Sequence, residues 1–153
     1  MITGTNGKST TCKLLQHILK KNKIDVQLGG NIGKPVLNLK IKKNTIVIIE
    51  ASSFQLYHAK VIKPTIATIL NITKDHLDWH GTVKNYQNSK FNIFSNQGYQ
   101  DQALLTKKEH IKKFKNSFFK SKLTKIPANN LKTDFKKKII NKYLRSKPNL
   151  ENV

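Results

Sequence analysis

The chain has 153 residues, the size of one domain and enough to bury a hydrophobic core, but too few for a multidomain synthetase. Hydrophobic residues make up 37% of it, and the longest apolar runs, Ile46 to Ile49 and Ile66 to Leu70, are too short to span a bilayer. The net charge of +21 can indicate nucleic-acid or membrane binding, but the basic residues are mainly lysines spread along the chain, so we expect neither partner.

The first predicted elements are a glycine-rich loop and the helix that it opens. The loop runs from Gly4 to Thr10, and apolar residues then recur at helical spacing through Lys21. Further along, the pattern predicts a short strand at Asp25 to Leu28, a loop at Gly29 to Gly33 and a helical turn at Pro35 to Leu39.

Two runs of consecutive β-branched and apolar residues, Thr45 to Glu50 and Ile66 to Asn71, predict strands that are covered on both faces. Such strands are typical of a parallel sheet with flanking helices, so the predicted fold class is α/β, with a mostly parallel, doubly wound sheet and a P-loop. Around these strands we predict a helix at Ser52 to Lys60, a loop and then a helix at His76 to Phe94, and a weaker strand at Ala103 to Leu105.

The pattern weakens from Lys107 onward, where we predict only a short strand near Leu123 to Ile126 and a helix at Leu131 to Leu144. A strand that feeds a phosphate-binding loop normally lies in the middle of its sheet, yet only three residues precede Gly4. We therefore expect a sheet that is incomplete at both ends, in a partial domain. A lone cysteine, Cys12, and the polar start of the chain favour a cytoplasmic protein without a secretory leader.

The glycine-rich loop is a candidate ATP site. Its backbone amides can point at phosphate oxygens, Lys8 supplies a positive charge, and the following hydroxyls of Ser9 and Thr10 are candidate magnesium ligands. The alternative is a tight turn in which one of these hydroxyls caps the helix. A turn does not need a lysine between a glycine and two hydroxyls, so we favour the phosphate site.

Polar residues end both predicted central strands, Glu50 after the first and Asn71 after the second. Ligands collect at the carboxyl ends of parallel strands, and a carboxylate there can hold Mg²⁺ beside the ATP phosphates. The segment from Asp75 to His80 contains possible zinc ligands, but beside a P-loop the more economical interpretation is that His76 alone helps to position magnesium or phosphate. We expect His80 at the surface and Trp79 against the sheet edge.

Five motifs resemble, in order, the central ATP-binding domain of the Mur ligases. The match is clear over residues 1–106 and weak over 107–153, where Lys147 to Asn152 resembles a degraded Gly-x-His-Asn segment near the adenine and would make Asn149 an ATP contact. The motifs are Gly4-Thr5-Asn6-Gly7-Lys8-Ser9-Thr10, Gly30-Asn31-Ile32-Gly33, Glu50-Ala51-Ser52-Ser53-Phe54-Gln55-Leu56, Asn71-Ile72-Thr73-Lys74-Asp75-His76-Leu77-Asp78 and Tyr86-Gln87-Asn88-Ser89-Lys90.

The resemblance, above all to the D-glutamate-adding members, implies a ligase of peptidoglycan synthesis, with roles in cell-wall biogenesis, cell shape and division. ATP would phosphorylate UDP-N-acetylmuramoyl-L-alanine to an acyl phosphate, and D-glutamate would attack it to form an amide. The family pattern makes Lys8, His76 and Lys90 catalytic, Gly4 to Thr10 ATP-binding, and Asn31, Ser52 and Ser53 substrate-binding. Magnesium would be held by Ser9, Thr10, Glu50, His76 and a carbamylated Lys90.

The resemblance also implies an N-terminal UDP-binding domain and a C-terminal domain, for which 153 residues leave no room, and a monomeric whole enzyme. We therefore expect the chain alone to be inactive. The alternative within the same superfamily is another Mur ligase or a folylpolyglutamate synthase-like ligase, against which Ser52 to Leu56 argues. The alternative from another class is a P-loop module with a basic surface for nucleic acid or membrane.

Overall fold

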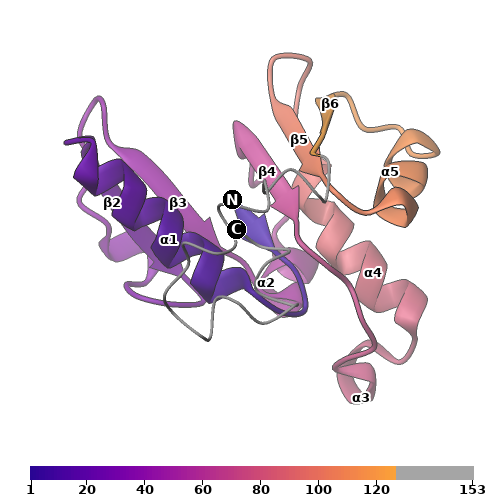
Figure 1. Ribbon diagram of the computed structural model, residues 1–153. Coiled ribbons are helices and arrows are strands. Elements are labelled where there is room, and N and C mark those ends of the chain that lie inside the picture. The colour runs from indigo at the N-terminus through magenta and orange to yellow at the C-terminus, as the bar shows by residue number, and fades with distance from the viewer. Residues whose placement is uncertain (127–153) are drawn as a thin grey trace, which may run out of the picture.

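Six parallel strands form one sheet in the order β2-β3-β1-β4-β5-β6. The computed structural model describes residues 1–126 (Figure 1). The strands are β1 (Ile2–Thr3), β2 (Val26–Gly30), β3 (Ile46–Glu50), β4 (Ile66–Ile69), β5 (Gln102–Leu105) and β6 (Lys122–Lys125). The helices are α1 (Lys8–Lys21), α2 (Ser53–His58), α3 (Leu77–His80), α4 (Val83–Phe91) and α5 (Lys108–Lys115), with 3-10 turns η1 (Val36–Asn38) and η2 (Asn92–Phe94).

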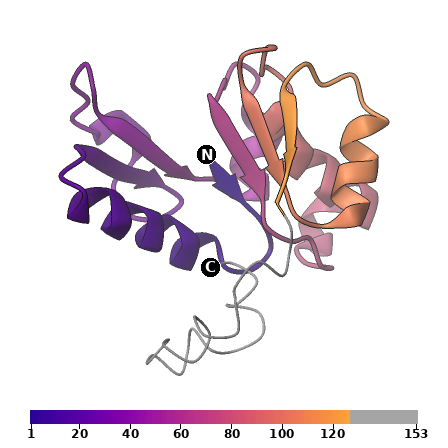
Figure 2. The ribbon, with the colours of Figure 1, turned by 45° about the horizontal axis from the view of Figure 1, so that its top comes forward.

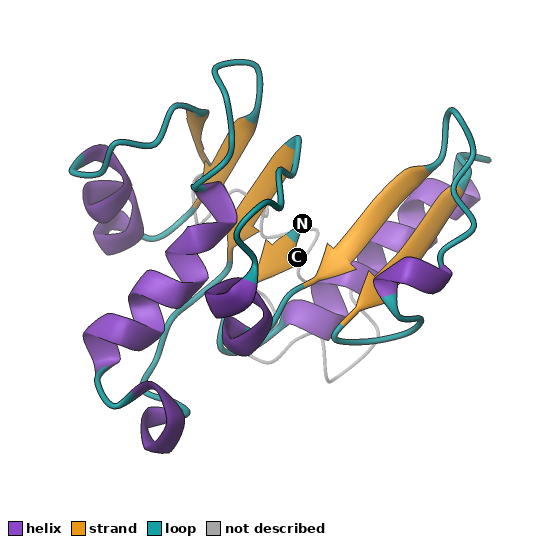
Figure 3. Cartoon of the chain, turned by 180° about the vertical axis from the view of Figure 1, so that it is seen from behind, coloured by secondary structure: helices purple, strands orange, loops and turns teal. Residues whose placement is uncertain are grey.

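The chain leaves the central strand β1 in one direction and later returns in the other, which puts helices on opposite faces of the sheet. Helix α1 packs on β1, β2 and β3, whereas α2, α4 and η2 pack beside β4 (Figures 2 and 3). Right-handed crossovers produce this arrangement, and the strand order reverses at β1. The carboxyl ends of β1, β3 and β4 therefore meet at the switch point where such sheets bind ligands.

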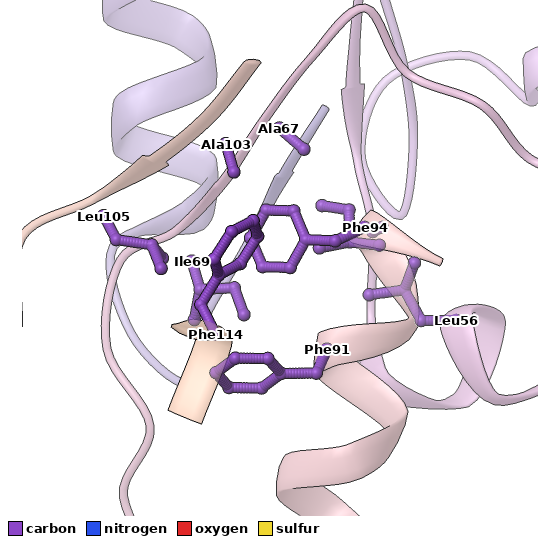
Figure 4. Close-up of a cluster of buried hydrophobic side chains, with 10 residues drawn as sticks. Leu56, Ala67, Ile69, Phe91, Phe94, Ala103, Leu105 and Phe114 are labelled. Atoms are coloured by element: carbon purple, nitrogen blue, oxygen red, sulfur yellow. The ribbon is translucent and has the colours of Figure 1, made fainter. Parts of the chain in front are cut away.

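Two hydrophobic clusters match the two faces. The smaller one, Ile2, Cys12, Val26 and Ile48, lies under α1. The larger one contains buried side chains from β4 and β5, the α2–α4 region and α5, with Phe94 in ring contact with Phe91 and Phe114 (Figure 4). Because Ile2 pairs in register with Thr68 rather than with Ala67 or Ile69, the clusters face opposite sides of the sheet.

The structure confirms the parallel α/β fold and every strand predicted within residues 1–126. The predicted coverage of β3 and β4 on both faces is incomplete at their starts, where Ile46 and Ile66 are 42% and 49% exposed. Further along, one face is buried and the other, with Val47, Ile49 and Thr68, is half-buried. Helix α5 was not predicted. The predicted helix at 131–144 lies outside the described residues. No helix within residues 1–126 is both long and apolar enough to cross a membrane.

Candidate functional site

The glycine-rich loop joins β1 to α1 and places Lys8 at the first position of the helix. Gly7 precedes it with a φ of 82°, a left-handed conformation that glycine adopts without strain. The Lys8 Nζ donates to the carbonyls of Gly4 and Thr5, both at 2.9 Å. No side chain caps α1, so neither Ser9 nor Thr10 has the capping role of the alternative interpretation. The first-turn amides of α1 face the loop as an anion site requires.

Glu50, at the end of β3, bonds both to the start of α1 and to the residue that follows β2. Its side chain is 1% exposed, and its two oxygens accept hydrogen bonds from Ser9 Oγ at 2.8 Å and Asn31 Nδ2 at 2.9 Å. Gly30 has a φ of 107°, and a Cβ there would overlap the Glu50 carbonyl, so glycine permits this close approach of β2 to β3. A carboxylate beside a hydroxyl is a donor set that suits a hard cation such as Mg²⁺.

Asn71 fixes the outer part of the loop from the end of β4. The Asn6 backbone N–H donates to Asn71 Oδ1 at 2.8 Å, and Asn71 Nδ2 donates to the Asn6 carbonyl at 3.0 Å. The Thr5 N–H also donates to the Asn71 carbonyl at 2.8 Å. Asn71, which follows the strand next to β1, thus holds the outer part of the phosphate-binding loop at Thr5 and Asn6.

Lys90 is buried beneath the same loop. Its side chain is 2% exposed, its Nζ donates to the Gly4 carbonyl at 2.9 Å, and it lies 4.6 Å from the Tyr86 ring centroid. Burial, together with the charge of Lys8, lowers the pKa of Lys90 to about 7. Lys90 is therefore not a solvated surface lysine, and its burial favours the neutral, nucleophilic amine over the ammonium form.

Burial of Lys90 predicts that stability depends on pH. Its pKa falls on folding from 10.5 to about 7, so between these pH values the unfolded chain binds more protons than the folded chain. The free energy of unfolding should rise with pH in this window, by up to about 1.4 kcal/mol per pH unit from this group. Urea denaturation at pH 7, 8 and 9 should show that Lys90→Met removes this slope, whereas Lys84→Met, an exposed lysine of the same helix, retains it.

Tyr86 supports the phosphate-binding loop, a role that the sequence alone did not indicate. It is 1% exposed, and its hydroxyl lies 3.0 Å from Thr5 Oγ1, which also receives the Thr73 N–H at 3.0 Å. Tyr86→Phe should lower the free energy of unfolding by about 1 kcal/mol, because the Thr5 hydroxyl loses a buried partner. Urea denaturation measures this, and Tyr99→Phe, a tyrosine that is 78% exposed, should have no effect. Equal midpoints for both variants would contradict the assignment.

Seven of the predicted site residues line one cavity of about 280 Å³, namely Thr5, Lys8, Asn31, Ser52, Ser53, His76 and Lys90. Ser52 and Ser53 enter from the start of α2, where Ser52 and Gln55 form a reciprocal capping box. The lining residues are Thr5, Lys8, Asn31, Ser52, Ser53, Phe54, Asp75, His76, Tyr86 and Lys90. The structure thus brings together residues from five separate motifs, while Asn149 lies outside the described residues.

The histidine segment differs from the prediction at two positions. His76 faces the cavity from the start of α3, but His80 is 5% exposed and not at the surface; burial, with the charges of His76 and Lys90, lowers its pKa. Trp79 is 45% exposed and packs on rings of α2, including Phe54 and Tyr57, instead of the sheet edge. Within residues 1–126 no three His, Cys, Asp or Glu side chains converge as a zinc site requires.

A family model described as the Mur ligase middle domain matches residues 2–150. The chain belongs to the Mur ligase middle domain family. Among its relatives, the UDP-N-acetylmuramoylalanine–D-glutamate ligase of Bartonella henselae is 53% identical over 93 residues, which are 60% of this chain and 20% of that enzyme. The ligase of the same name from Fervidobacterium nodosum is 34% identical over 99% of this chain and 35% of its own length. The chain therefore spans about a fifth to a third of the length of these Mur ligases.

Solved structures show the same fold. MurF ligase from Thermotoga maritima in complex with ADP has a TM-score of 0.62 at 24% identity, and covers 81% of this chain and 31% of its own. FolC from E. coli, in complex with DHPP and ADP, has a TM-score of 0.53 at 17% identity over 80% of this chain and 41% of its own. The fold is therefore common to Mur ligases and FolC, and the sequence relatives, not the fold, place the chain among the Mur ligases.

Proposed function

We propose that this chain is the ATP-binding middle domain of a cytoplasmic enzyme that adds D-glutamate to UDP-N-acetylmuramoyl-L-alanine in peptidoglycan synthesis. The observation that carries the proposal is the convergence of Lys8, His76 and Lys90 on one cavity, whose lining residue Asn31 donates to Glu50, in a chain that is 53% identical over 93 residues to a ligase of that name. The family pattern in Ser52 to Leu56 supports D-glutamate as the amine. We also propose that flanking domains bind the UDP group and deliver the amino acid.

In this proposal the loop from Gly4 to Thr10 binds the ATP phosphates, and Asn149 contacts the adenine. Lys8 neutralises charge on the transferring phosphoryl group, which is the main catalytic contribution that a protein makes to such a transfer. Asn31, Ser52 and Ser53 orient the UDP-sugar substrate so that its carboxylate lies near the γ-phosphate.

The donor atoms fit a magnesium site. Ser9 Oγ lies 2.8 Å from the buried Glu50 carboxylate, and Thr10 follows it on the same helix. Magnesium, when bound there, supplies positive charge that stabilises the phosphates. Lys90 and His76 line the cavity from the other side, where we propose that they hold a second ion once Lys90 is carbamylated. Carbamylation requires the neutral amine, which the lowered pKa of Lys90 supplies.

The test of this proposal uses a replacement enzyme, in which residues of this chain replace the matching segment of the Bartonella henselae ligase. With ATP, magnesium, UDP-N-acetylmuramoyl-L-alanine and D-glutamate, the replacement enzyme should release phosphate and form the amide product. The isolated chain should form none, because sequestering the acyl phosphate from water requires closing domains. An inactive but folded replacement enzyme would contradict the proposed function, and product formation by the isolated chain would contradict the need for flanking domains.

A further inference from the structure

His80 is a buried polar residue between two elements that line the cavity. Its Nε2 lies 3.0 Å from Ser53 Oγ at the start of α2, and both side chains are buried. Its ring stacks on Phe54 at 5.5 Å and contacts Tyr86 edge-on at 5.2 Å between centroids. The Asn85 side chain donates to its carbonyl at 3.0 Å. His80 therefore contacts α2 and α4 while belonging to α3.

Helix α3 depends on such contacts because it is very short. It has four residues, Leu77–His80, far fewer than an isolated helix needs to be stable in water. His76, which precedes it, has a φ of 49°, a left-handed conformation that is costly for a residue other than glycine and persists only where the surroundings impose it. The His80 N–H donates to the His76 carbonyl at 3.0 Å, so the two residues sit at opposite ends of one turn.

We infer that His80 is a positioning residue: its hydrogen bond to Ser53 fixes α3 against α2 and so sets the position of His76 across the cavity from Ser52 and Ser53. Ser53 and His76 both line the cavity. His80 contacts Ser53 through its side chain and donates its backbone N–H to the carbonyl of His76, so one residue connects both. In a ligase, the distance between Ser53, which would orient the substrate, and His76, which would lie near the phosphates, would then depend on His80. This catalytic meaning rests on the proposed function.

If His80 only filled space in the packing, its ring alone would matter and its hydrogen bond to Ser53 would not. The ring does contact Phe54, Trp79 and Tyr86, and phenylalanine would preserve such packing. Glutamine, in contrast, can preserve the hydrogen bond to Ser53 while removing the ring. His80→Phe and His80→Gln therefore separate the two roles, and Ser53→Ala removes the same hydrogen bond from its other end without changing the histidine.

The first experiment uses the 153-residue chain and does not depend on activity. ¹H–¹⁵N spectra should show that His80→Phe and Ser53→Ala shift or broaden the backbone amides of Asp75 to Leu77 and the His76 ring resonances. His80→Gln should leave them close to wild type. The control is His17→Phe, at an exposed histidine of α1, which should change none of them. Unchanged His76 resonances in both His80→Phe and Ser53→Ala would overturn the inference.

The second experiment measures turnover in the replacement enzyme. His80→Phe should lower kcat by about 10- to 100-fold, the usual effect of a small misplacement in a reacting geometry, with the KM for ATP changed less than about twofold. His80→Gln should recover most of the loss. An equal loss in His80→Gln and His80→Phe would show that the hydrogen bond to Ser53 does not by itself set the geometry, and wild-type turnover in His80→Phe would show that only the ring matters; either result would overturn the inference. If the unmutated replacement enzyme is inactive, the proposed function fails, and the spectra alone still decide the role of His80.

Discussion

Lys8→Ala is expected to weaken nucleotide binding to this chain by 10-fold or more and to lower kcat/KM of the replacement enzyme by about 10²- to 10³-fold. Lys8 is the first residue of α1, and its Nζ donates to the loop carbonyls of Gly4 and Thr5. Removing it takes away a positive charge that the transferring phosphoryl group needs, and leaves the hydrophobic clusters intact.

Isothermal titration of the chain with MgATP, and steady-state kinetics of the replacement enzyme, measure the two effects. Lys13→Ala is the matched control, because Lys13 is an exposed lysine one turn further along the same helix. Affinity and turnover like those of the wild type in Lys8→Ala, with both proteins folded, would remove the ATP-site assignment.

Lys90→Ala is expected to inactivate the replacement enzyme, by about 10²-fold or more, and to regain activity when acetate or formate is added. The proposal makes the carbamate of Lys90 an anion that faces the phosphate site, and alanine leaves space for a small carboxylate at the same place. Lys90 is 2% exposed beneath the Gly4 carbonyl, so an added acid would occupy a defined position and not the open surface.

The measurement is the rate of phosphate release with and without 0.1 M acetate, compared with Lys84→Ala, which changes an exposed lysine of α4 and should need no rescue. Mass spectrometry of the untreated chain under CO₂ should also detect the carbamate on Lys90. Loss of activity without rescue, together with an unmodified mass, would leave Lys90 as a buried lysine with a structural role only.

The convergence of Lys8 and Glu50 was predictable because strand polarity dictates it. In a parallel sheet the carboxyl ends of neighbouring strands share one edge, so a loop after β1 and a carboxylate at the end of β3 must meet there. The environment of Lys90 was not predictable in the same way. Its helix contains one other lysine, Lys84, and only the packing of α4 under the loop distinguishes the buried Lys90 from it.

Errors arose where burial depends on partners distant in sequence. His80 was expected at the surface because nothing in its own segment shows that α2 covers it with Ser53 and Phe54. The runs in β3 and β4 predicted burial along both faces, but the composition of a strand does not say how far its neighbours extend over it, and the first residues, Ile46 and Ile66, stay exposed. Helix α5 was missed, although Ile111 and Phe114 carry a helical spacing, because five lysines surround them in Lys108–Lys115 and its immediate flank.

The described residues form two halves with separate hydrophobic clusters, and this has a consequence for the way in which they unfold. One half has its cluster under α1, beside β2 and β3, and the other half has the larger cluster, with buried side chains from β4 and β5. Such halves can open separately, as two cooperative units of local unfolding. The phosphate-binding loop connects them, since it contacts Glu50 on one side and Asn71 on the other. A nucleotide on that loop should therefore slow amide hydrogen exchange in both halves at once, far beyond the residues that it touches.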